Sequence, residues 1–211
     1  MAVPFLTVAI GASAAVPTVN LLAGGLNIVM LNHERHAARW RDALRLFIPA
    51  AIVIPFVAFG VRRLSSDALS IITGVMILAG TVVLAKGLRA PRLAGRRGAA
   101  IAGSLSGAAN VSAGVGGPIA AMYAINADWP AAAYRPTLQA YFLGINIVSV
   151  ASRGLPSLHH PALFVAMVAS GVVGWLVGRR VATRVDHQFV RNLTLAVAAI
   201  GGTVAILRGL L

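Results

Sequence analysis

The stretch Asn110-Val-Ser-Ala-Gly-Val-Gly-Gly-Pro118 lies in the middle of a charge-free run that covers residues 98–127. Glycine favours non-helical backbone and proline has no N–H to donate, so three glycines and a proline within residues 114–118 predict a break in a helix. In lipid, freed backbone groups are tolerated only where protein or a water-filled cavity surrounds them. A helix that restarts near Pro118 would direct unpaired N–H groups and a positive dipole end at the break. The stretch therefore predicts an anion-binding site near the middle of a membrane.

The composition places this stretch in a membrane protein. Of 211 residues, 58% are hydrophobic and 11% are charged, and the mean hydropathy is +0.84. Soluble domains average about 25% charged residues, and a chain with so few charges cannot cover a soluble fold of this size. The net charge of +13 comes from Lys and Arg clustered between apolar runs, as the positive-inside rule expects of cytoplasmic loops. These features exclude a soluble enzyme and disfavour a nucleic-acid partner. The absence of cysteine excludes disulfides and thiolate metal sites.

Seven hydrophobic segments predict an all-α integral membrane protein, since only helices or closed barrels satisfy the backbone in lipid and no strand alternation is present. The segments are the charge-free runs 1–33, 46–61, 68–85, 98–127, 136–152, 154–178 and 192–207.

An internal repeat divides the chain. PTVNLLAGGLNIV from Pro17 matches PTLQAYFLGINIV from Pro136 at an offset of 119 residues, and GTVVLAKGL (80–88) matches GTVAILRGL (202–210) at a slightly larger offset. Two halves built from one unit are typical of secondary transporters. We therefore expect a first membrane repeat over residues 1–89, a basic cytoplasmic linker over 90–98 and a second repeat over 99–211. The broken helix opens the second repeat, and its counterpart in the first repeat would fall before Met1, so that opening helix is expected to be missing.

The number of Lys and Arg residues on each side of the membrane distinguishes two topologies of the broken segment. If residues 98–127 cross the membrane once, the two sides carry 11 and 7 Lys and Arg; if the segment is re-entrant and returns to its starting side, they carry 14 and 4. The re-entrant arrangement fits the positive-inside rule better and makes the two repeats inverted.

Candidate substrate-binding residues fall into two groups. The first surrounds the break and consists of Asn110, Ser112, Gly114, Gly116, Gly117, Pro118 and Tyr123. The second comprises amide side chains inside apolar runs, which either line a pore or form interhelical hydrogen bonds: Asn20, Asn27, Gln139 and Asn146. The alternative for the glycines is close helix packing. We expect Thr18 and Thr137 to bond their own helix carbonyls, and favour an interfacial anchor over an anion ligand for Arg153.

The residues around the break resemble a known family. GSLSGAANVSAGVGGPIAAMY (103–123), followed by YRPTLQAYF (134–142), is similar to the second signature of the sulfite exporter TauE/SafE family, and VPFL (3–6) looks like the tail of its first signature, whose glycines are missing here. The resemblance covers nearly the whole chain. It implies a permease of two related halves that moves sulfite, sulfonates or similar small anions.

The leading hypothesis is thus a permease of the inner (plasma) membrane for a small anionic substrate, with neutral donors and no carboxylate inside the spans. The alternative is a truncated, non-transporting subunit or remnant of such a permease. An enzyme is disfavoured because Ser106 and Ser112 have no His, Lys or acid in the spans to activate them. The sequence predicts no cofactor and no metal site, and it allows a homo-oligomer.

Overall fold

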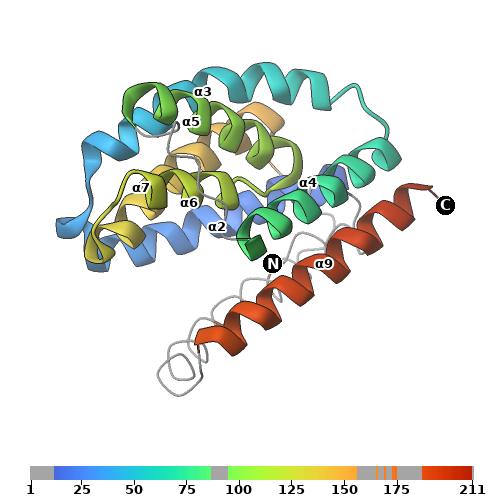
Figure 1. Cartoon of the computed structure of the whole chain (residues 1–211). Coiled ribbons are helices and arrows are strands. Elements are labelled where there is room, and N and C mark those ends of the chain that lie inside the picture. The colour runs from blue at the N-terminus through green and yellow to red at the C-terminus, as the bar shows by residue number, and fades with distance from the viewer. Residues whose placement is uncertain are drawn as a thin grey trace.

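The computed structural model describes residues 12–86, 95–155 and 187–210, together with positions 165, 169, 173 and 174. The described chain is helical and contains no strand, which confirms the all-α prediction (Figure 1). Its main elements, in order, are α2 (Ala12–Glu34), the 3₁₀ turn η1 (Arg35–Ala37), α3 (Trp40–Val61), α4 (Ser66–Lys86), α5 (Gly95–Ala113), α6 (Gly117–Asn126), α7 (Ala131–Arg153) and α9 (His187–Leu210).

Four of the described helices are long and apolar enough to cross a bilayer, namely the segments Ala14–Ala37, Trp40–Val61, Ser66–Lys86 and Asn192–Leu210. On α3, Ile48, Ile52 and Phe56 recur every fourth residue and are 56–75% exposed, as expected of a lipid-facing stripe. The helices α5 and α7 are more polar, and they bury Ser106, Asn110, Ser112, Thr137, Asn146 and Ser149. The predicted segment 154–178 lies almost wholly outside the described residues.

Close glycine contacts fix α5 against α3. A Cβ atom at Gly103 would overlap the carbonyl oxygen of Leu46, and one at Gly107 would lie 2.8 Å from the Ala50 Cβ. Gly103 meets Leu46 and Gly107 meets Ala50, so the contacts progress in the same direction along both helices and α3 runs parallel to α5. Gly103 and Gly107 form a GxxxG pair, which lets two membrane helices approach until their backbones touch.

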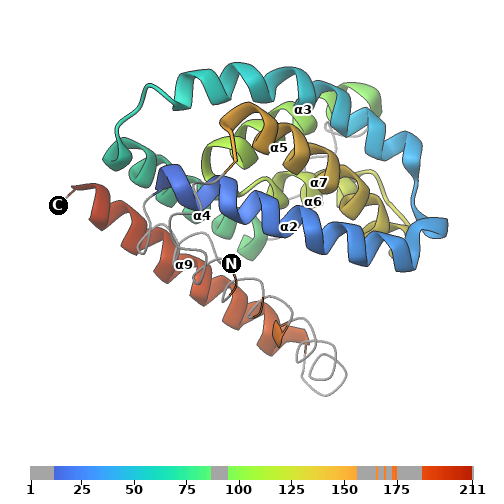
Figure 2. The same ribbon diagram turned by 180° about the vertical axis from the view of Figure 1, so that it is seen from behind.

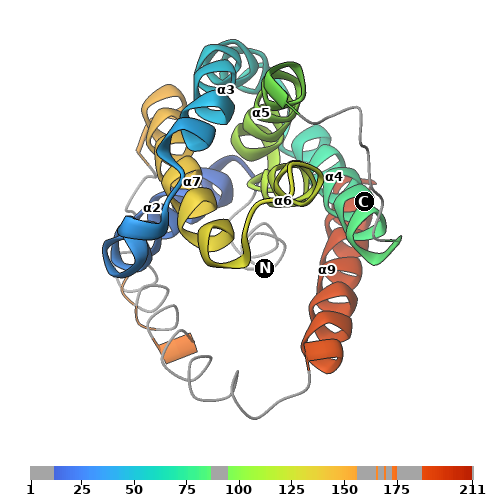
Figure 3. The same ribbon diagram turned by 60° about the vertical axis from the view of Figure 1, so that its left-hand side comes forward.

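Two other helix pairs are antiparallel. On α9, a Cβ at Gly209 would lie 2.5 Å from the carbonyl oxygen of Asp67, and the start of α4 therefore packs against the end of α9. Between α2 and α7, the Met30 sulfur lies 3.6 Å from Gln139 Nε2, whereas Gly24 packs near Asn146. Figures 2 and 3 show both pairs, on opposite sides of α6. The end of α7 lies 119 residues after the end of α2, which is the offset of the sequence repeat.

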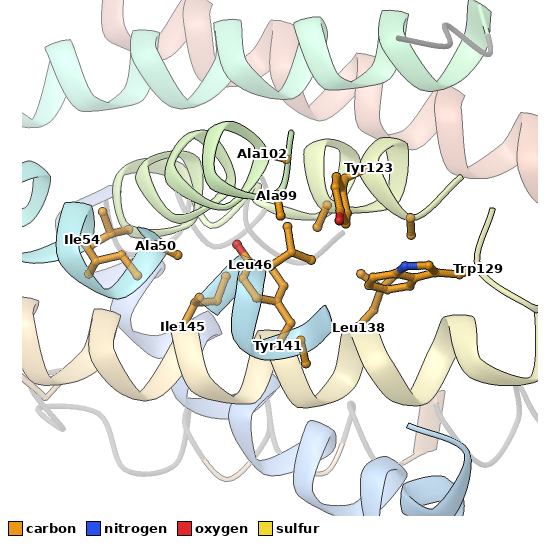
Figure 4. Close-up of a cluster of buried hydrophobic side chains, with 14 of the residues drawn as sticks. Leu46, Ala50, Ile54, Ala99, Ala102, Tyr123, Trp129, Leu138, Tyr141 and Ile145 are labelled. Atoms are coloured by element: carbon orange, nitrogen blue, oxygen red, sulfur yellow. The ribbon is translucent and has the colours of Figure 1, made fainter. Parts of the chain in front are cut away.

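The apolar core lies between α3, α5, α6 and α7 (Figure 4). Leu46, Tyr141 and Ile145 are fully buried in it, and the Tyr123 and Trp129 rings meet edge to face with their centroids 5.9 Å apart. The two tyrosines also tie the core to α5, since the Tyr141 hydroxyl lies 3.4 Å from the Gly103 carbonyl oxygen and the Tyr123 hydroxyl 3.4 Å from that of Gly95. The core thus holds α5 and α6 at one end of the bundle.

The run 98–127 is broken, as predicted, and its second helix turns back along the first. Helix α5 ends at Ala113 and α6 begins at Gly117. The start of α6 lies beside Ser106, halfway along α5, and Tyr123 of α6 lies beside Gly95, the first residue of α5. Helix α6 therefore returns along α5 to the end at which α5 begins.

Of the two threonines expected to bond their own helices, one does so and the other does not. Thr18 donates to its own helix, at the Ala14 carbonyl (2.7 Å), but Thr137 accepts the Arg39 N–H (2.9 Å) and so anchors the start of α3 to α7. Asp42 lies inside the first turn of α3, 5% exposed, and forms ion pairs of 2.9 Å with Arg39 and Arg45.

Replacing Gly103 by alanine is expected to lower the free energy of unfolding by about 1–3 kcal/mol, the usual effect of overpacking, because the new methyl group meets the Leu46 backbone. Denaturant unfolding in detergent measures the loss. Gly60→Ala is the matched control, since nothing lies within 4 Å of a Cβ at Gly60. Equal stability of the two variants would contradict the close α3–α5 contact.

Candidate functional site

The break between α5 and α6 is built by a left-handed glycine. Gly114 has φ +67°, a conformation that side chains disfavour, and its N–H donates to the Asn110 carbonyl at 2.8 Å. The next amide, at Val115, donates to the Ala109 carbonyl at 3.3 Å. These bonds satisfy part of the end of α5, as in common helix C-caps. The chain can then reverse and begin α6 with Pro118 in its first turn.

The start of α6 leaves backbone donors without partners. The first helical bond of α6 runs from the Ala120 N–H to the Gly116 carbonyl at 3.4 Å, and the Ser106 hydroxyl donates to the same carbonyl at 2.8 Å. Among the described residues, the amides of Gly116, Gly117 and Ile119 have no hydrogen-bond acceptor. Such bare amides carry the positive end of the helix dipole.

The depth of this helix start follows from its contact with Ser106. Ser106 lies nine residues after Arg97, the last charged residue before the apolar part of α5. At 1.5 Å per residue this corresponds to roughly 14 Å. The hydrocarbon core of a bilayer is about 30 Å thick. This distance predicts a position near the middle of the membrane for the start of α6.

The glycines around the break differ in how much space an added side chain would have. A Cβ at Gly116 would lie 2.7 Å from the Ser106 carbonyl oxygen, so only glycine fits there without a shift. At Gly117 no atom of the described residues lies within 4 Å of the added atom. Pro118 packs on Gly80 of α4, where a Cβ would lie 2.9 Å from the proline ring. The open side of the helix start is thus the side of Gly117.

Three buried polar side chains form a cluster beside the break. Asn110 Nδ2 donates to Asn146 Oδ1 at 3.0 Å and to Ser149 Oγ at 3.2 Å. All three residues are at most 5% exposed. The cluster joins α5 to α7 and lies next to Gly116, because a Cβ there would be 3.1 Å from the Asn110 Cβ. The sequence predicted both asparagines but missed Ser149, whose signal is its position three residues after Asn146 on the same helix face.

A cavity of about 570 Å³ lies on the other side of Asn146, between α2 and α7. Among the described residues that line it, Asn20 and Asn146 are the polar ones, and the others are Leu21, Gly24, Gly25, Ile28, Leu143, Ile147, Val150, Ala151, Gly154 and Leu155. Asn20 is 2% exposed, and its Nδ2 has no partner within the described part of the chain. The break residues Gly114, Gly116, Gly117 and Pro118 do not line the cavity. Asn146 is the link between the cavity and the break.

Arg153 contributes the nearest positive charge. Its Nη1 donates to the Val111 carbonyl at 2.9 Å, in the last turn of α5, where a cation is favoured by the helix dipole. The neighbouring Arg62 donates to the Ser152 carbonyl. The side chain of Arg153 is half-buried and bonded into the end of α5. Asp42, the one buried carboxylate among the described residues, lies at the opposite end of α3 in ion pairs.

The other predicted candidates lie elsewhere. The Ser112 hydroxyl bonds its own helix at the Ala108 carbonyl (2.6 Å) and contacts the Met76 sulfur. Tyr123 belongs to the apolar core. Asn27 of α2 and Gln139 of α7 lie within the two repeated stretches, and each has one buried atom without a partner among the described residues. Within the described residues, no group of three His, Asp or Glu side chains is placed to hold a metal ion.

Comparison with known proteins identifies one family. The family model for the sulfite exporter TauE/SafE matches residues 1–204, nearly the full chain. No curated protein and no solved structure matched.

A double-mutant cycle tests the cluster. Asn110→Ala and Asn146→Ala are expected to show a coupling free energy of about 0.6–1.7 kcal/mol, the range of hydrogen bonds between membrane helices. Unfolding in detergent of the two single variants and the double variant measures it. The control pairs Asn146→Ala with Asn126→Ala, because Asn126 bonds the Met122 carbonyl of its own helix. Additive effects within about 0.5 kcal/mol in the first cycle would contradict the bond.

Proposed function

The chain belongs to the sulfite exporter TauE/SafE family, and from this premise we propose that it is a permease whose small anion binds at the start of α6. Membership makes the protein a membrane transporter of sulfite or related anions. The finer proposal concerns the substrate, a small sulfur-containing or related organic anion, and its binding groups. Of the predicted residues it uses Asn110, Gly116, Gly117 and Asn146, with Ser149 added.

The observation that carries the proposal is the set of bare amides at Gly116, Gly117 and Ile119. A negative charge near the start of a helix is stabilised by the dipole and by N–H groups that have no other acceptor. Inside a membrane such groups are costly to leave unpaired, because no lipid atom accepts a hydrogen bond. An anion beside Gly117, where the structure has open space, would satisfy them.

The side chains around the start of α6 also favour a negatively charged ligand. The cluster next to the helix start consists of neutral amides and a hydroxyl, and Arg153 is bonded into the adjacent end of α5. None of the described carboxylates takes part in this cluster, so none of them repels an oxyanion there. The one buried acid of the described helices, Asp42, lies in ion pairs at the start of α3 and away from the break, so the site itself holds no acid for a sodium ion or a proton relay.

Two other functions are less well supported. A non-transporting subunit would not need open space beside Gly117, and it is distinguished by the absence of anion flux. An enzyme would need an activated nucleophile, but the Ser106 and Ser112 hydroxyls donate to backbone carbonyls.

The two-repeat organisation extends the proposal to the orientation of the chain. We assign residues 1–89 and 99–211 to two inverted repeats around a linker at 90–98, in a plasma membrane, since the repeat-matched helices α2 and α7 run antiparallel. Thr137 and Gly95 place the starts of α3, α5 and α7 at one end. That end holds Arg35, Arg39, Arg41, Arg45, Arg96, Arg97 and Arg135, and the opposite end Arg62, Arg63, Arg153 and Arg208. By the positive-inside rule the first end is cytoplasmic.

Gly117→Leu is expected to lower anion uptake at least about tenfold, a loss of roughly 1.4 kcal/mol in binding, because the side chain occupies the open space at the bare amides. Uptake of labelled sulfite and of a sulfonate into proteoliposomes is the measurement. Gly60→Leu, on the outer face of α3, adds the same side chain away from the site and should leave flux unchanged. Normal flux through folded Gly117→Leu protein would refute the site.

Single cysteines test the orientation, since the chain contains none of its own. Ser65→Cys, in the exposed turn after α3, is expected to react with a membrane-impermeant maleimide added outside intact cells. His36→Cys, exposed in η1, should react only after the cells are opened. The reverse labelling pattern would show that the basic end faces outward.

A further inference from the structure

One buried hydroxyl group holds a backbone carbonyl at the start of α6. The Ser106 side chain is fully buried on α5 and donates to the Gly116 carbonyl oxygen at 2.8 Å. The same oxygen accepts the Ala120 N–H at 3.4 Å, which is longer than the usual range of about 2.7–3.2 Å for such bonds. The serine hydroxyl is therefore the shorter and stronger of the two contacts that keep this carbonyl in place.

The Gly116 carbonyl and the Gly117 amide belong to one rigid peptide plane. In a trans peptide the C=O and N–H bonds point in opposite directions, and the described chain contains no cis peptide. A carbonyl turned towards Ser106 therefore turns the Gly117 N–H away from α5. At Gly117 no atom of the described residues lies within 4 Å of an added Cβ, so there is open space beside this amide. The serine thus orients a donor for a ligand that it does not itself contact.

This peptide would rotate easily without the hydroxyl group. It joins two glycines, which tolerate backbone conformations that other residues disfavour. Rotation by half a turn would place the Gly116 oxygen where the Gly117 N–H now points. A carbonyl oxygen carries a partial negative charge and would repel an anion there. The orientation of one peptide plane therefore decides whether this position favours an anion.

A second hydroxyl group holds Ser106 in position. Tyr141 of α7 is fully buried, its hydroxyl points towards α5 (Figure 4), and it is hydrogen-bonded to the Ser106 side chain. Because the Ser106 proton is directed at Gly116, the tyrosine hydroxyl is the donor in this contact. The order of the bonds is thus from Tyr141 to Ser106 and from Ser106 to the Gly116 carbonyl. Such a connected set of buried polar groups restricts the geometry of each member.

We propose that Ser106 is a positioning residue for transport, whose hydroxyl fixes the Gly116–Gly117 peptide so that the Gly117 N–H faces the anion. The proposal rests on the anion site proposed above and assigns its preference for negative charge to one side chain. Tyr141 supports the same orientation through its contact with Ser106. Neither side chain contacts the anion in this arrangement.

Ser106→Ala tests this role in transport. The KM of sulfite uptake into proteoliposomes is expected to rise about fivefold, the effect of one typical hydrogen bond, while the maximal rate changes less. Ser70→Ala is the matched control, because Ser70 is also buried and donates to a backbone carbonyl, at Ser66 (2.9 Å). Its KM should equal that of the unmodified protein.

The result separates the positioning role from the site itself. An unchanged KM in folded Ser106→Ala protein would overturn the role of Ser106, and the site would stand if Gly117→Leu still lowers flux. Normal flux through folded Gly117→Leu protein would refute the site and the role together.

Tyr141→Phe covers the case in which Ser106→Ala does not fold. It keeps the ring in the core and removes only the hydroxyl that holds Ser106, so the KM is expected to rise at least about twofold. Tyr134→Phe is the control on the same helix, because the Tyr134 hydroxyl has no hydrogen-bond partner among the described residues. Equal KM values for the two tyrosine variants would overturn the proposal.

Nuclear magnetic resonance reports on the peptide directly. Protein labelled with carbonyl ¹³C and amide ¹⁵N in glycine gives a one-bond carbon–nitrogen signal only for Gly–Gly peptides, which begin at Gly24, Gly116 and Gly201. In bilayers, sulfite is expected to shift the signal of the 116–117 peptide in the unmodified chain and to require about fivefold more sulfite in Ser106→Ala. The other two peptides are internal controls. An identical response of the 116–117 signal in both proteins would contradict the proposal.

Discussion

The structure depends on how the protein treats a helix that ends inside a bilayer. Every helix end exposes up to four N–H or C=O groups, and lipid cannot pair them. At the end of α5 these groups are met by the backbone turn at Gly114 and by the Arg153 guanidinium. At the start of α6 the carbonyl of Gly116 is paired, but the amides around it are not. The carbonyl groups at the end of α5 therefore have partners, whereas the amides at the start of α6 can still donate hydrogen bonds. This difference is the physical basis of the proposed anion site.

Close packing makes this break possible. Gly103 and Gly107 bring α5 against the backbone of α3, Gly116 fits beside Ser106, and Gly80 admits Pro118. Each of these positions would place a Cβ atom within 3.0 Å of another group. The glycines thus serve both the break and the packing, two roles that the sequence presented as alternatives. The same contacts surround the freed backbone with protein, as its depth in the membrane requires.

Three buried asparagines connect the α2–α7 interface to the break. Asn20 and Asn146 face the cavity, Asn146 bonds Asn110, and Asn110 lies against the break. Inside a membrane, polar side chains are retained where they pair with one another or face a cavity. Here Asn146 does both, so the cavity and the helix start are coupled through a single side chain.

Much of this was determined by the sequence alone. The absence of charge over residues 98–127 and the glycines around Pro118 predicted a broken helix, because Gly and Pro act on the local backbone whatever surrounds them. The 119-residue repeat predicted that α2 and α7 correspond, and their C-terminal ends match. The tertiary structure decided what local chemistry cannot: that Ser149 joins the two asparagines, that Tyr123 belongs to the core, that Thr137 binds α3 and that Arg153 reaches the end of α5. The hydrogen bonds of Ser149, Arg153 and Thr137 join residues 39, 42 and 98 positions apart. The partner of a polar side chain in a helical bundle depends on how the helices pack, which no local sequence pattern encodes.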